Sequence, residues 1–321
     1  MDKNKNPLPI ISFLLSITAI CFSLIAILKG EQEIEPVLTD PIENIPLSIP
    51  GDLPEIMANA KTLDLPDSLL FAGEPVPMQM ADVQERLDRE LHINTYWHSS
   101  TIFLLKRAKR WLPQIEPVLK EHGIPDDFKY VAVIESGLSN VTSPSDAVGF
   151  WQFVEGTGKE YGLEINKFVD ERYDPLKATE AACLYLKEAH ERFQNWTNVA
   201  ASYNRGMNGL RRAIENQQTS NYYDLYLNSE TSRYMFRVLA CKEIFEHPEK
   251  YGFDVSEEHL YLPEKIHYVE VTESIDDLVQ FSIDHGTNYK ILKRFNPWLM
   301  DYKLPVKKER VYRIALPGNG G

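Results

Sequence analysis

The chain has 321 residues, of which 43% are hydrophobic and 25% charged, a balance that is ordinary for a globular protein and argues against wholesale disorder. This length is enough for one or two domains with a real core. The net charge is −13, and residues 31–90 hold 14 acidic against three basic residues, so the sequence offers no clustered basic face of the kind that nucleic-acid-binding proteins need.

Residues 1–30 are predicted to form an N-terminal membrane anchor. Residues 10–28 are 19 in a row without a charge, which is about the length of a helix that crosses a bilayer core. Lys3 and Lys5 precede this run and glutamates follow it, so the positive-inside rule places the N-terminus in the cytoplasm and the rest of the chain outside. A cleaved signal peptide and a lipid anchor on Cys21 remain the alternatives.

Residues 31–80 have the composition of an acidic, proline-rich tether. Eight prolines fall between Pro36 and Pro77, with many acids and little periodicity, which is typical of an extended, solvated spacer. The stretch LPDSLLFAGEPVPM near its end is a candidate to pack on the domain that follows.

Residues 81–252 are predicted to form a helical domain. Apolar residues recur at three- and four-residue steps, Asp174 and Pro175 provide an N-cap and a first helical residue, and Gly123, Gly137 and Gly206 provide stops. No convincing strand is found, although short hairpins over 140–170 stay open. Helices are expected over 81–93, 100–123, 125–137, 174–193, 195–204, 206–216 and 228–248.

Residues 263–318 change character and are predicted to form a small α+β module. The stretches KIHYVEV and ERVYRIALP alternate like strands, and two short helical patterns lie between them. The predicted order is strand, helix, helix, strand.

Glu135 is the first candidate for chemistry. It ends the apolar run from Val131 to Ile134, at the C-terminal end of a predicted helix. Burial and the helix dipole both raise the pKa of a carboxyl at such a position, which suits a general acid. A surface glutamate at a helix end is the alternative.

Three further segments could accompany Glu135. In SPSDAVGFWQF, Gly149 permits close approach, Gln152 supplies an amide, and Phe150 and Trp151 supply apolar faces on which a sugar ring could stack. Ordinary core aromatics are the alternative for that segment. SYNRG and ETSRY then contribute further polar and aromatic groups: Tyr203, Asn204, Glu230 and Tyr234.

In their order and spacing, ESGLSN, SPSDAVGFWQF, ASYNRGMNGL and ETSRYMFRVLA resemble the four motifs of the soluble-lytic-transglycosylase domain, in the lysozyme-like superfamily. The resemblance covers about residues 95–250 and implies a mainly α, lysozyme-like catalytic fold. It implies an enzyme that cleaves the glycosidic bond between N-acetylmuramic acid and N-acetylglucosamine in peptidoglycan without water, leaving a 1,6-anhydro end.

The same resemblance implies a role for each matching residue. Glu135 maps onto the single catalytic acid and base. The other matching positions would bind substrate or support the acid, and they are Ser136, Ser143, Gly149, Gln152, Tyr203, Asn204, Glu230 and Tyr234.

The chain departs from the family pattern at several positions. Ser145-Asp146 stands where Ala-Gly is usual, Arg205 where a small residue is usual, and Trp151 where relatives vary. These changes could alter subsite shape, but none removes the acid or its amide partners.

The terminal module resembles a LysM module, which binds glycans that contain N-acetylglucosamine. Asn296-Pro297 matches the end of its second helix. Its first loop has Thr272-Glu273-Ser274 in place of Gly-Asp-Thr, so glycan binding and a structural docking role are both expected readings.

The remaining expectations concern metals, thiols, partners and location. The eight His are scattered and no metal-binding motif occurs, so neither a metal nor a cofactor is expected. Cys183 and Cys241 are read as free buried thiols, with a disulfide as the alternative. The expected partners are peptidoglycan strands and, through the anchor, the inner membrane, with the catalytic domain in the periplasm. A hydrolytic muramidase and a non-catalytic scaffold are the rival functions.

Overall fold

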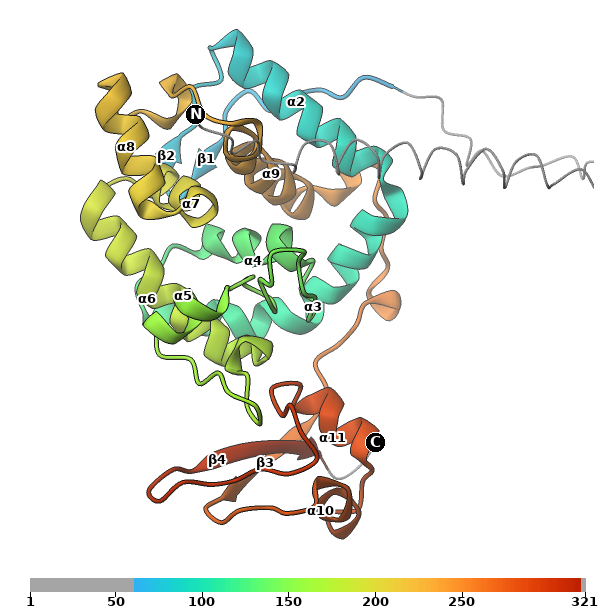
Figure 1. Ribbon diagram of the computed structural model, residues 1–321. Coiled ribbons are helices and arrows are strands. Elements are labelled where there is room, and N and C mark those ends of the chain that lie inside the picture. Colours follow the sequence, from blue (N-terminus) through green and yellow to red (C-terminus); the bar gives the residue numbers. More distant parts are fainter. Residues whose placement is uncertain (1–60, 319–321) are drawn as a thin grey trace, which may run out of the picture. The chain divides into compact units, whose positions relative to one another are not determined.

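The computed structural model describes residues 61–318, which belong to one compact unit that begins at Lys61. The predicted anchor over 1–30 and most of the predicted tether lie outside the described residues. Figure 1 shows that the described part of the chain is mainly helical, as predicted, and it also contains two antiparallel strand pairs. The helices are α2 (Ala81–Tyr96), α3 (His98–Glu121), α4 (Lys129–Ser136), α5 (Glu155–Glu160), α6 (Pro175–Phe193), α7 (Trp196–Arg205), α8 (Met207–Gln217), α9 (Ser229–Glu246), α10 (Leu278–Asp284) and α11 (Tyr289–Phe295).

The packed unit begins before the first helix. The strands β1 (Leu70–Phe71) and β2 (Glu74–Pro75) form a short hairpin, and the side chains of Phe71 and Val76 are buried in the main core. The segment that was a candidate to pack on the next domain therefore does so. The hairpin itself was not predicted, because two-residue strands are too short to show an alternation.

The helix ends follow the local signals that the sequence provides. The carboxylate of Asp174 accepts hydrogen bonds from the backbone N–H groups of Leu176 and Lys177 at the start of α6, at 2.9 and 3.1 Å. Gly206 separates α7 from α8, and Gly137 ends α4 in the left-handed region, at φ 60°. The helices predicted between residues 81 and 248 are all present, each displaced by a few residues at most.

Helix α4 lies in the main core and positions its last turn for chemistry. It packs against α3 and α9 (Figure 1), and Val131, Ala132 and Val133 are fully or almost fully buried. Helices α6, α7 and α9 complete the packing, since α6 contacts α7 and α7 contacts α9. The apolar run before Glu135 is thus the core-facing part of a short helix.

Between α4 and α6 the chain forms loops and the short helix α5. Isolated β-bridges join Thr142 to Val148, Val148 to Phe153, and Ile165 to Asp170. The hairpins left open over 140–170 are therefore present only as single bridges.

The C-terminal module has the predicted order of elements. The strands β3 (Ile266–Val271) and β4 (Tyr312–Pro317) pair antiparallel, with Ile266 opposite Pro317 and Val271 opposite Tyr312. A second core contains Leu278, Leu292 and Ile314. The domain boundaries proposed at residues 80, 252 and 263 stay predictions.

Cys183 and Cys241 are both buried free thiols in the structure, as expected. Within residues 61–318, none of the helices combines the length and the apolar character that a membrane span requires.

Candidate active site

Glu135 lies in the last turn of α4, where its neighbours are apolar. Burial of its carboxyl is the main influence on its pKa and raises it above the ordinary value of 4.5. The exposed Glu230 adds to that increase, whereas the hydrogen bond from Tyr234 and the charge of Arg237 oppose it. The net direction is upward, so the site favours a protonated carboxyl.

Tyr234 holds the carboxyl of Glu135 from α9. Its hydroxyl donates a hydrogen bond to Oε1 of Glu135 at 2.6 Å, and its side chain is 1% exposed. From the same helix, the guanidinium of Arg237 donates to the carbonyl oxygen of Ile134 at 3.0 Å. Two contacts from α9 therefore fix both the acid and the backbone that precedes it.

Tyr203 reaches the same region from α7. Its hydroxyl donates to the carbonyl oxygen of Trp151 at 2.8 Å. Burial raises the pKa of Tyr203 well above its ordinary value, and the nearby carboxyl of Glu135 adds to the increase. Tyr203 therefore joins the segment ASYNRGMNGL to the segment SPSDAVGFWQF, close to Glu135.

Asn204 and Glu230 form a polar link between α7 and α9. The amide of Asn204 donates to Oε1 of Glu230 at 3.0 Å and accepts from the hydroxyl of Thr231 at 2.8 Å. Glu230 is exposed, and its charge acts on Glu135 through space. The segments SYNRG and ETSRY thus contact each other through Asn204, Glu230 and Thr231.

The two serines do not contact the carboxyl of Glu135. The hydroxyl of Ser136 donates to the carbonyl oxygens of Phe150 and Ala132, at 2.9 and 3.2 Å. The hydroxyl of Ser143 accepts from the backbone N–H groups of Ser145 and Ala147. In this structure both residues order the backbone around the acid.

Gly149 is required by a close backbone approach. Its φ is 78°, and a Cβ placed on it would lie 1.9 Å from the carbonyl oxygen of Arg172. No side chain fits in that space. The close approach predicted from the sequence is therefore made to another part of the chain.

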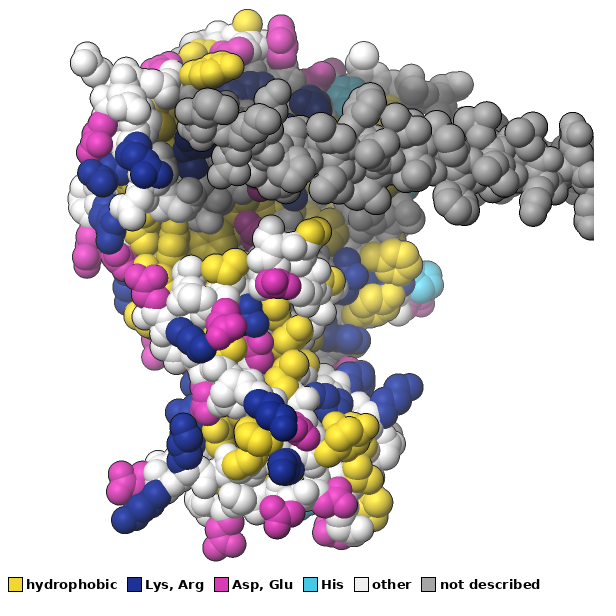
Figure 2. Space-filling model, in the orientation of Figure 1, with side chains coloured by type: hydrophobic (Ala, Val, Ile, Leu, Met, Phe, Trp, Pro, Cys, Tyr) yellow, Lys and Arg dark blue, Asp and Glu magenta, His cyan; other side chains and the backbone are white. Residues whose placement is uncertain are grey.

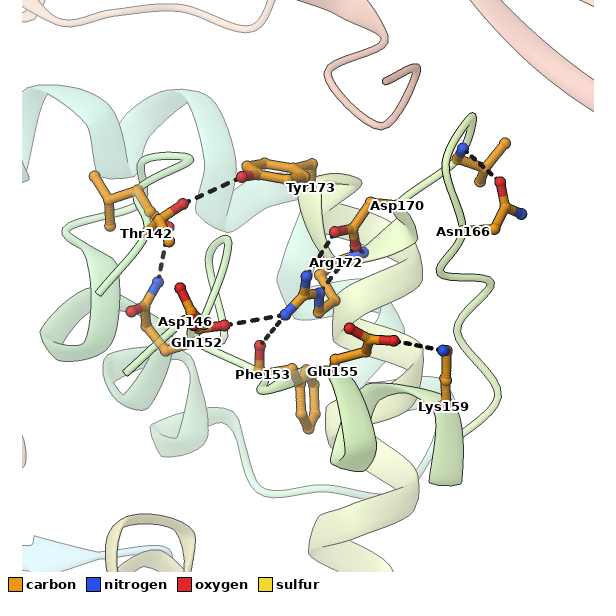
Figure 3. A network of polar contacts seen from close by, with 12 residues as sticks. Thr142, Asp146, Gln152, Phe153, Glu155, Lys159, Asn166, Asp170, Arg172 and Tyr173 are labelled. Atoms are coloured by element: carbon orange, nitrogen blue, oxygen red, sulfur yellow. Dashed lines mark hydrogen bonds and ion pairs between the residues drawn. The ribbon is translucent and has the colours of Figure 1, made fainter. Parts of the chain in front are cut away.

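Gln152 has a positive φ of 50°, which is uncommon for a residue with a side chain. Its amide nitrogen donates to the carbonyl oxygens of Gly149 and Val141, at 2.8 and 3.1 Å (Figure 3). The amide is half-buried, and its carbonyl oxygen makes no hydrogen bond among the described residues.

Phe150 and Trp151 require a correction. Phe150 is 2% exposed and Trp151 is fully buried, with its indole N–H donating to the hydroxyl of Thr179 at 2.9 Å. Neither ring presents a face on which a sugar could stack. The alternative of ordinary core aromatics holds for both, because Trp151 is held against α6 by Thr179 and Phe150 packs against Trp111 of α3.

Arg172 is a residue that the sequence reasoning missed. Its guanidinium pairs with Asp170 at 2.7 Å and donates to the carbonyl oxygens of Asp146 and Phe153, both at 3.1 Å (Figure 3). It therefore anchors the loop that carries Gly149 and Gln152. Its partners include carbonyl groups about 20 residues away, for which a sequence carries no direct signal.

In the C-terminal module, Asn296 and Ser274, which lie at two positions compared above with the LysM pattern, both make hydrogen bonds within the module. The amide of Asn296 donates to the carbonyl oxygen of Ala315 and accepts from its N–H, both at 2.7 Å, which joins α11 to β4. The hydroxyl of Ser274 accepts from the N–H of Val306 at 2.9 Å. Both contacts are structural.

Among residues 61–318, no cluster of His, Cys, Asp and Glu could hold a metal ion. On the face seen in Figure 2, acidic and basic side chains are interspersed over the described part of the surface. Nothing on this face resembles the continuous basic stripe that nucleic acids favour.

Two families match this chain. Residues 115–226 match the family described as Transglycosylase SLT domain, and residues 267–320 match the soluble lytic transglycosylase C-terminal LysM-like domain. The first match includes the motifs around Glu135, Gln152 and Tyr203, and it ends just before the segment with Tyr234.

Two curated relatives illustrate the similarity. The chain is 26% identical over 218 residues to membrane-bound lytic murein transglycosylase D of Escherichia coli K12, an alignment that covers 63% of this chain and 47% of the relative. It is 29% identical over 112 residues to a putative tributyltin chloride resistance protein of an Alteromonas species, which covers 34% of this chain and 54% of that protein. The chain thus spans about half the length of these relatives.

The matches and the geometry lead to the same assignment. Helices α4 and α7, which carry Glu135 and Tyr203, lie within the first matched region, α9 with Tyr234 follows it, and the strand–helix–helix–strand module coincides with the second. The chain therefore carries a transglycosylase SLT domain followed by a LysM-like C-terminal domain, and it is distantly related to membrane-bound lytic murein transglycosylase D.

Proposed function

We propose that this protein is a lytic transglycosylase that cleaves the β-1,4 bond between N-acetylmuramic acid and N-acetylglucosamine in peptidoglycan. The observation that carries the proposal is the environment of Glu135, a half-buried residue whose carboxyl accepts a hydrogen bond from Tyr234 and whose pKa is raised by desolvation. The matched SLT domain supports the substrate class, and so does the similarity to membrane-bound lytic murein transglycosylase D of Escherichia coli.

In the first step, Glu135 acts as the general acid. Its protonated carboxyl donates a proton to the glycosidic oxygen while the bond from that oxygen to C1 of the muramoyl residue breaks. The hydroxyl of Tyr234 keeps Oε1 in place during the transfer. The carbonyl oxygen of the substrate's own 2-acetamido group stabilises the positive charge that develops at C1.

In the second step, the same residue acts as the base. The Glu135 carboxylate accepts the proton of the C6 hydroxyl as that oxygen bonds to C1, which closes a 1,6-anhydro ring. The acid is regenerated and no water is consumed. We assign the acetamido and hydroxyl groups of the substrate to Gln152, Tyr203 and Asn204. Tyr203 and Asn204 lie on α7, and Gln152 follows Trp151, whose carbonyl oxygen accepts from Tyr203.

The rival reaction is hydrolysis by a muramidase, which ordinarily uses two carboxyl groups. Glu230 is the acidic residue whose charge acts on Glu135, and it is exposed and hydrogen-bonded to Asn204. We therefore assign Glu230 the role of orienting Asn204. A non-catalytic scaffold is disfavoured because Glu135 and Gln152 are both present and positioned.

We further propose that the chain acts in the periplasm, anchored in the inner membrane by its N-terminal apolar run. The charge pattern around residues 10–28 supports this location, and so does the similarity to a membrane-bound relative.

The test is mass spectrometry of the products released from purified peptidoglycan. We expect muropeptides with anhydro-muramic acid ends, each one water lighter than the hydrolysis product. Reducing ends would instead show a muramidase, and no release by the folded protein would favour a binding role.

The variant Glu135→Gln should lose turnover by about a thousandfold or more, because it removes the proton that the reaction needs while keeping the shape of the side chain. The matched control is Glu85→Gln, an exposed glutamate on α2. Normal product release by Glu135→Gln would reject the assignment of the acid.

A further inference from the structure

A cavity of about 180 Å³ lies between the SLT domain and the LysM-like module. Trp111 and Gln114 of α3 and Asn140 of the loop after α4 line one side, and Tyr268, Trp298 and Arg313 of the module line the other. We call this cavity the interdomain pocket. Both sides belong to the single compact unit that begins at Lys61.

The walls of the interdomain pocket are built from fixed aromatic rings. Trp111 packs edge-on against Phe150, with ring centroids 5.0 Å apart, and Trp298 stacks on Tyr312 at 5.6 Å. The amide of Asn140 donates to the carbonyl oxygen of Tyr173 at 3.0 Å. The pocket is therefore preformed, because residues outside it fix the side chains that line it.

The arginines that line the pocket differ in whether they form ion pairs. Arg294 pairs with both carboxylate oxygens of Glu264, at 2.7 and 2.5 Å, and Arg110 approaches the same carboxylate at 3.9 Å. Arg313 is an exposed residue of β4 that stands opposite Glu270 of β3, and its guanidinium lies over the ring of Tyr268, 4.4 Å from the centroid. It forms no ion pair within 4.0 Å in the described part of the chain.

Asp174, the other acid of the pocket, does not neutralise Arg313. Its carboxyl accepts two backbone N–H groups at the start of α6, and burial raises its pKa. The pocket therefore presents one unpaired guanidinium beside an aromatic face. A neutral sugar would be served by the aromatic walls and amides alone, whereas a carboxylate would also pair with the guanidinium.

Helix α3 connects the pocket to the catalytic acid. Arg107 lies against Gly137, which ends the helix that carries Glu135, and Trp111 and Gln114 follow it at helical spacing. At 1.5 Å per residue, seven residues correspond to about 10 Å along α3. A branch of a substrate bound at Glu135 could reach that far.

We propose that the interdomain pocket binds a free carboxylate of the stem peptide that branches from the peptidoglycan strand. The inference rests on the proposed function for the identity of the substrate. It adds that the enzyme binds the stem peptide as well as the glycan strand. Arg313 pairs with the carboxylate, and the rings of Trp111 and Tyr268 contact the apolar part of the peptide.

The test measures binding separately from cleavage. The full chain carries Glu135→Gln, so that strands stay intact, and fluorescence anisotropy gives the Kd for two probes. One probe is soluble peptidoglycan strands with native stem carboxylates, and the other is the same strands with these carboxylates converted to amides. Arg313→Gln is compared with Lys290→Gln, an exposed lysine on α11 that does not line the pocket.

We expect Arg313→Gln to raise the Kd for native strands about tenfold, the loss typical of one charge-assisted hydrogen bond, and to leave the Kd for amidated strands unchanged. Lys290→Gln should leave both values unchanged. An unchanged Kd for native strands in Arg313→Gln would overturn the inference, and so would an equal loss on both probes, which would indicate a neutral sugar or a structural role.

A third outcome separates this inference from the proposed function. If the Arg313-dependent preference for native strands is present but the wild-type chain releases no product, the pocket stands and the proposed reaction fails. If the wild-type chain releases anhydro products while binding shows no such preference, the reaction stands and the pocket inference fails.

Discussion

At the residue scale, the protonation of Glu135 decides both chemistry and stability. Because burial raises its pKa, the folded protein binds this proton more tightly than the unfolded chain does. The resulting stabilisation is fully present below the ordinary value of 4.5 and is lost as the pH rises through the folded-state pKa. The active form of the acid disappears over the same range, so the rate should fall as well.

We therefore expect Glu135→Gln to be more stable than the wild type at about pH 8, because the amide cannot ionise. The gap should shrink as the pH falls toward 4.5. Urea unfolding of both proteins over this pH range measures it. A gap that does not change with pH would show that the carboxyl titrates in the folded state as it does in water.

At the element scale, Glu74 fastens the N-terminal hairpin to the start of α7. Its carboxylate accepts the backbone N–H groups of Trp196 and Thr197, at 2.6 and 2.9 Å, together with the hydroxyl of Thr197 and the amide of Asn195. A negative charge at this end also complements the helix dipole. The same helix carries Tyr203 in its last turn, so the hairpin helps to position the site.

Replacing Glu74 by Ala should cost about 1 to 2 kcal/mol of stability, as for the loss of a helix cap. Glu74→Gln should recover part of this loss, because its amide oxygen still accepts hydrogen bonds. Glu85→Ala, on the exposed face of α2, serves as the matched control. Equal unfolding midpoints for Glu74→Ala and the control would mean that the four hydrogen bonds add no net stability.

The contrast between predicted and observed elements has physical causes. Helix periodicity and caps such as Asp174 are local, so the helices could be predicted from the sequence. The choice of Glu135, Tyr203 and Tyr234 as candidate site residues followed from the resemblance of their segments to the motifs of the soluble-lytic-transglycosylase domain. The burial of Phe150 and Trp151 could not be predicted, because an aromatic residue in a loop has the same local pattern whether it faces solvent or core. The role of Arg172 depends on distant carbonyl groups.

At the scale of the whole molecule, the LysM-like module contacts residues 164–173, which in turn contact the loop of residues 141–153. We call this loop, which carries Gly149 and Gln152, the active-site loop. Backbone hydrogen bonds join Asp170 to Trp298 and Met300 to Phe168, at 2.9 and 2.8 Å. Arg310 pairs with Glu171 at 3.0 Å. These contacts hold residues 164–173 from the side of the module.

Removal of the module should therefore loosen the active-site loop as well as residues 164–173. The connection runs through Arg172, which lies in the supported segment and donates to the carbonyl oxygens of Asp146 and Phe153. Val169 is 1% exposed in the core that it shares with the module, and truncation after residue 262 would expose it to water.

Hydrogen exchange followed by mass spectrometry compares the full chain with the chain that ends at residue 262. We expect faster exchange in residues 164–173 and, through Arg172, in residues 141–153, whereas the buried helix α9 should be unchanged. If exchange rises only in residues 164–173, the module supports its docking segment alone. If it rises in both, the module contributes to the geometry around Gln152 even where it touches no substrate, because the loop keeps its close approach at Gly149 only while Arg172 is held.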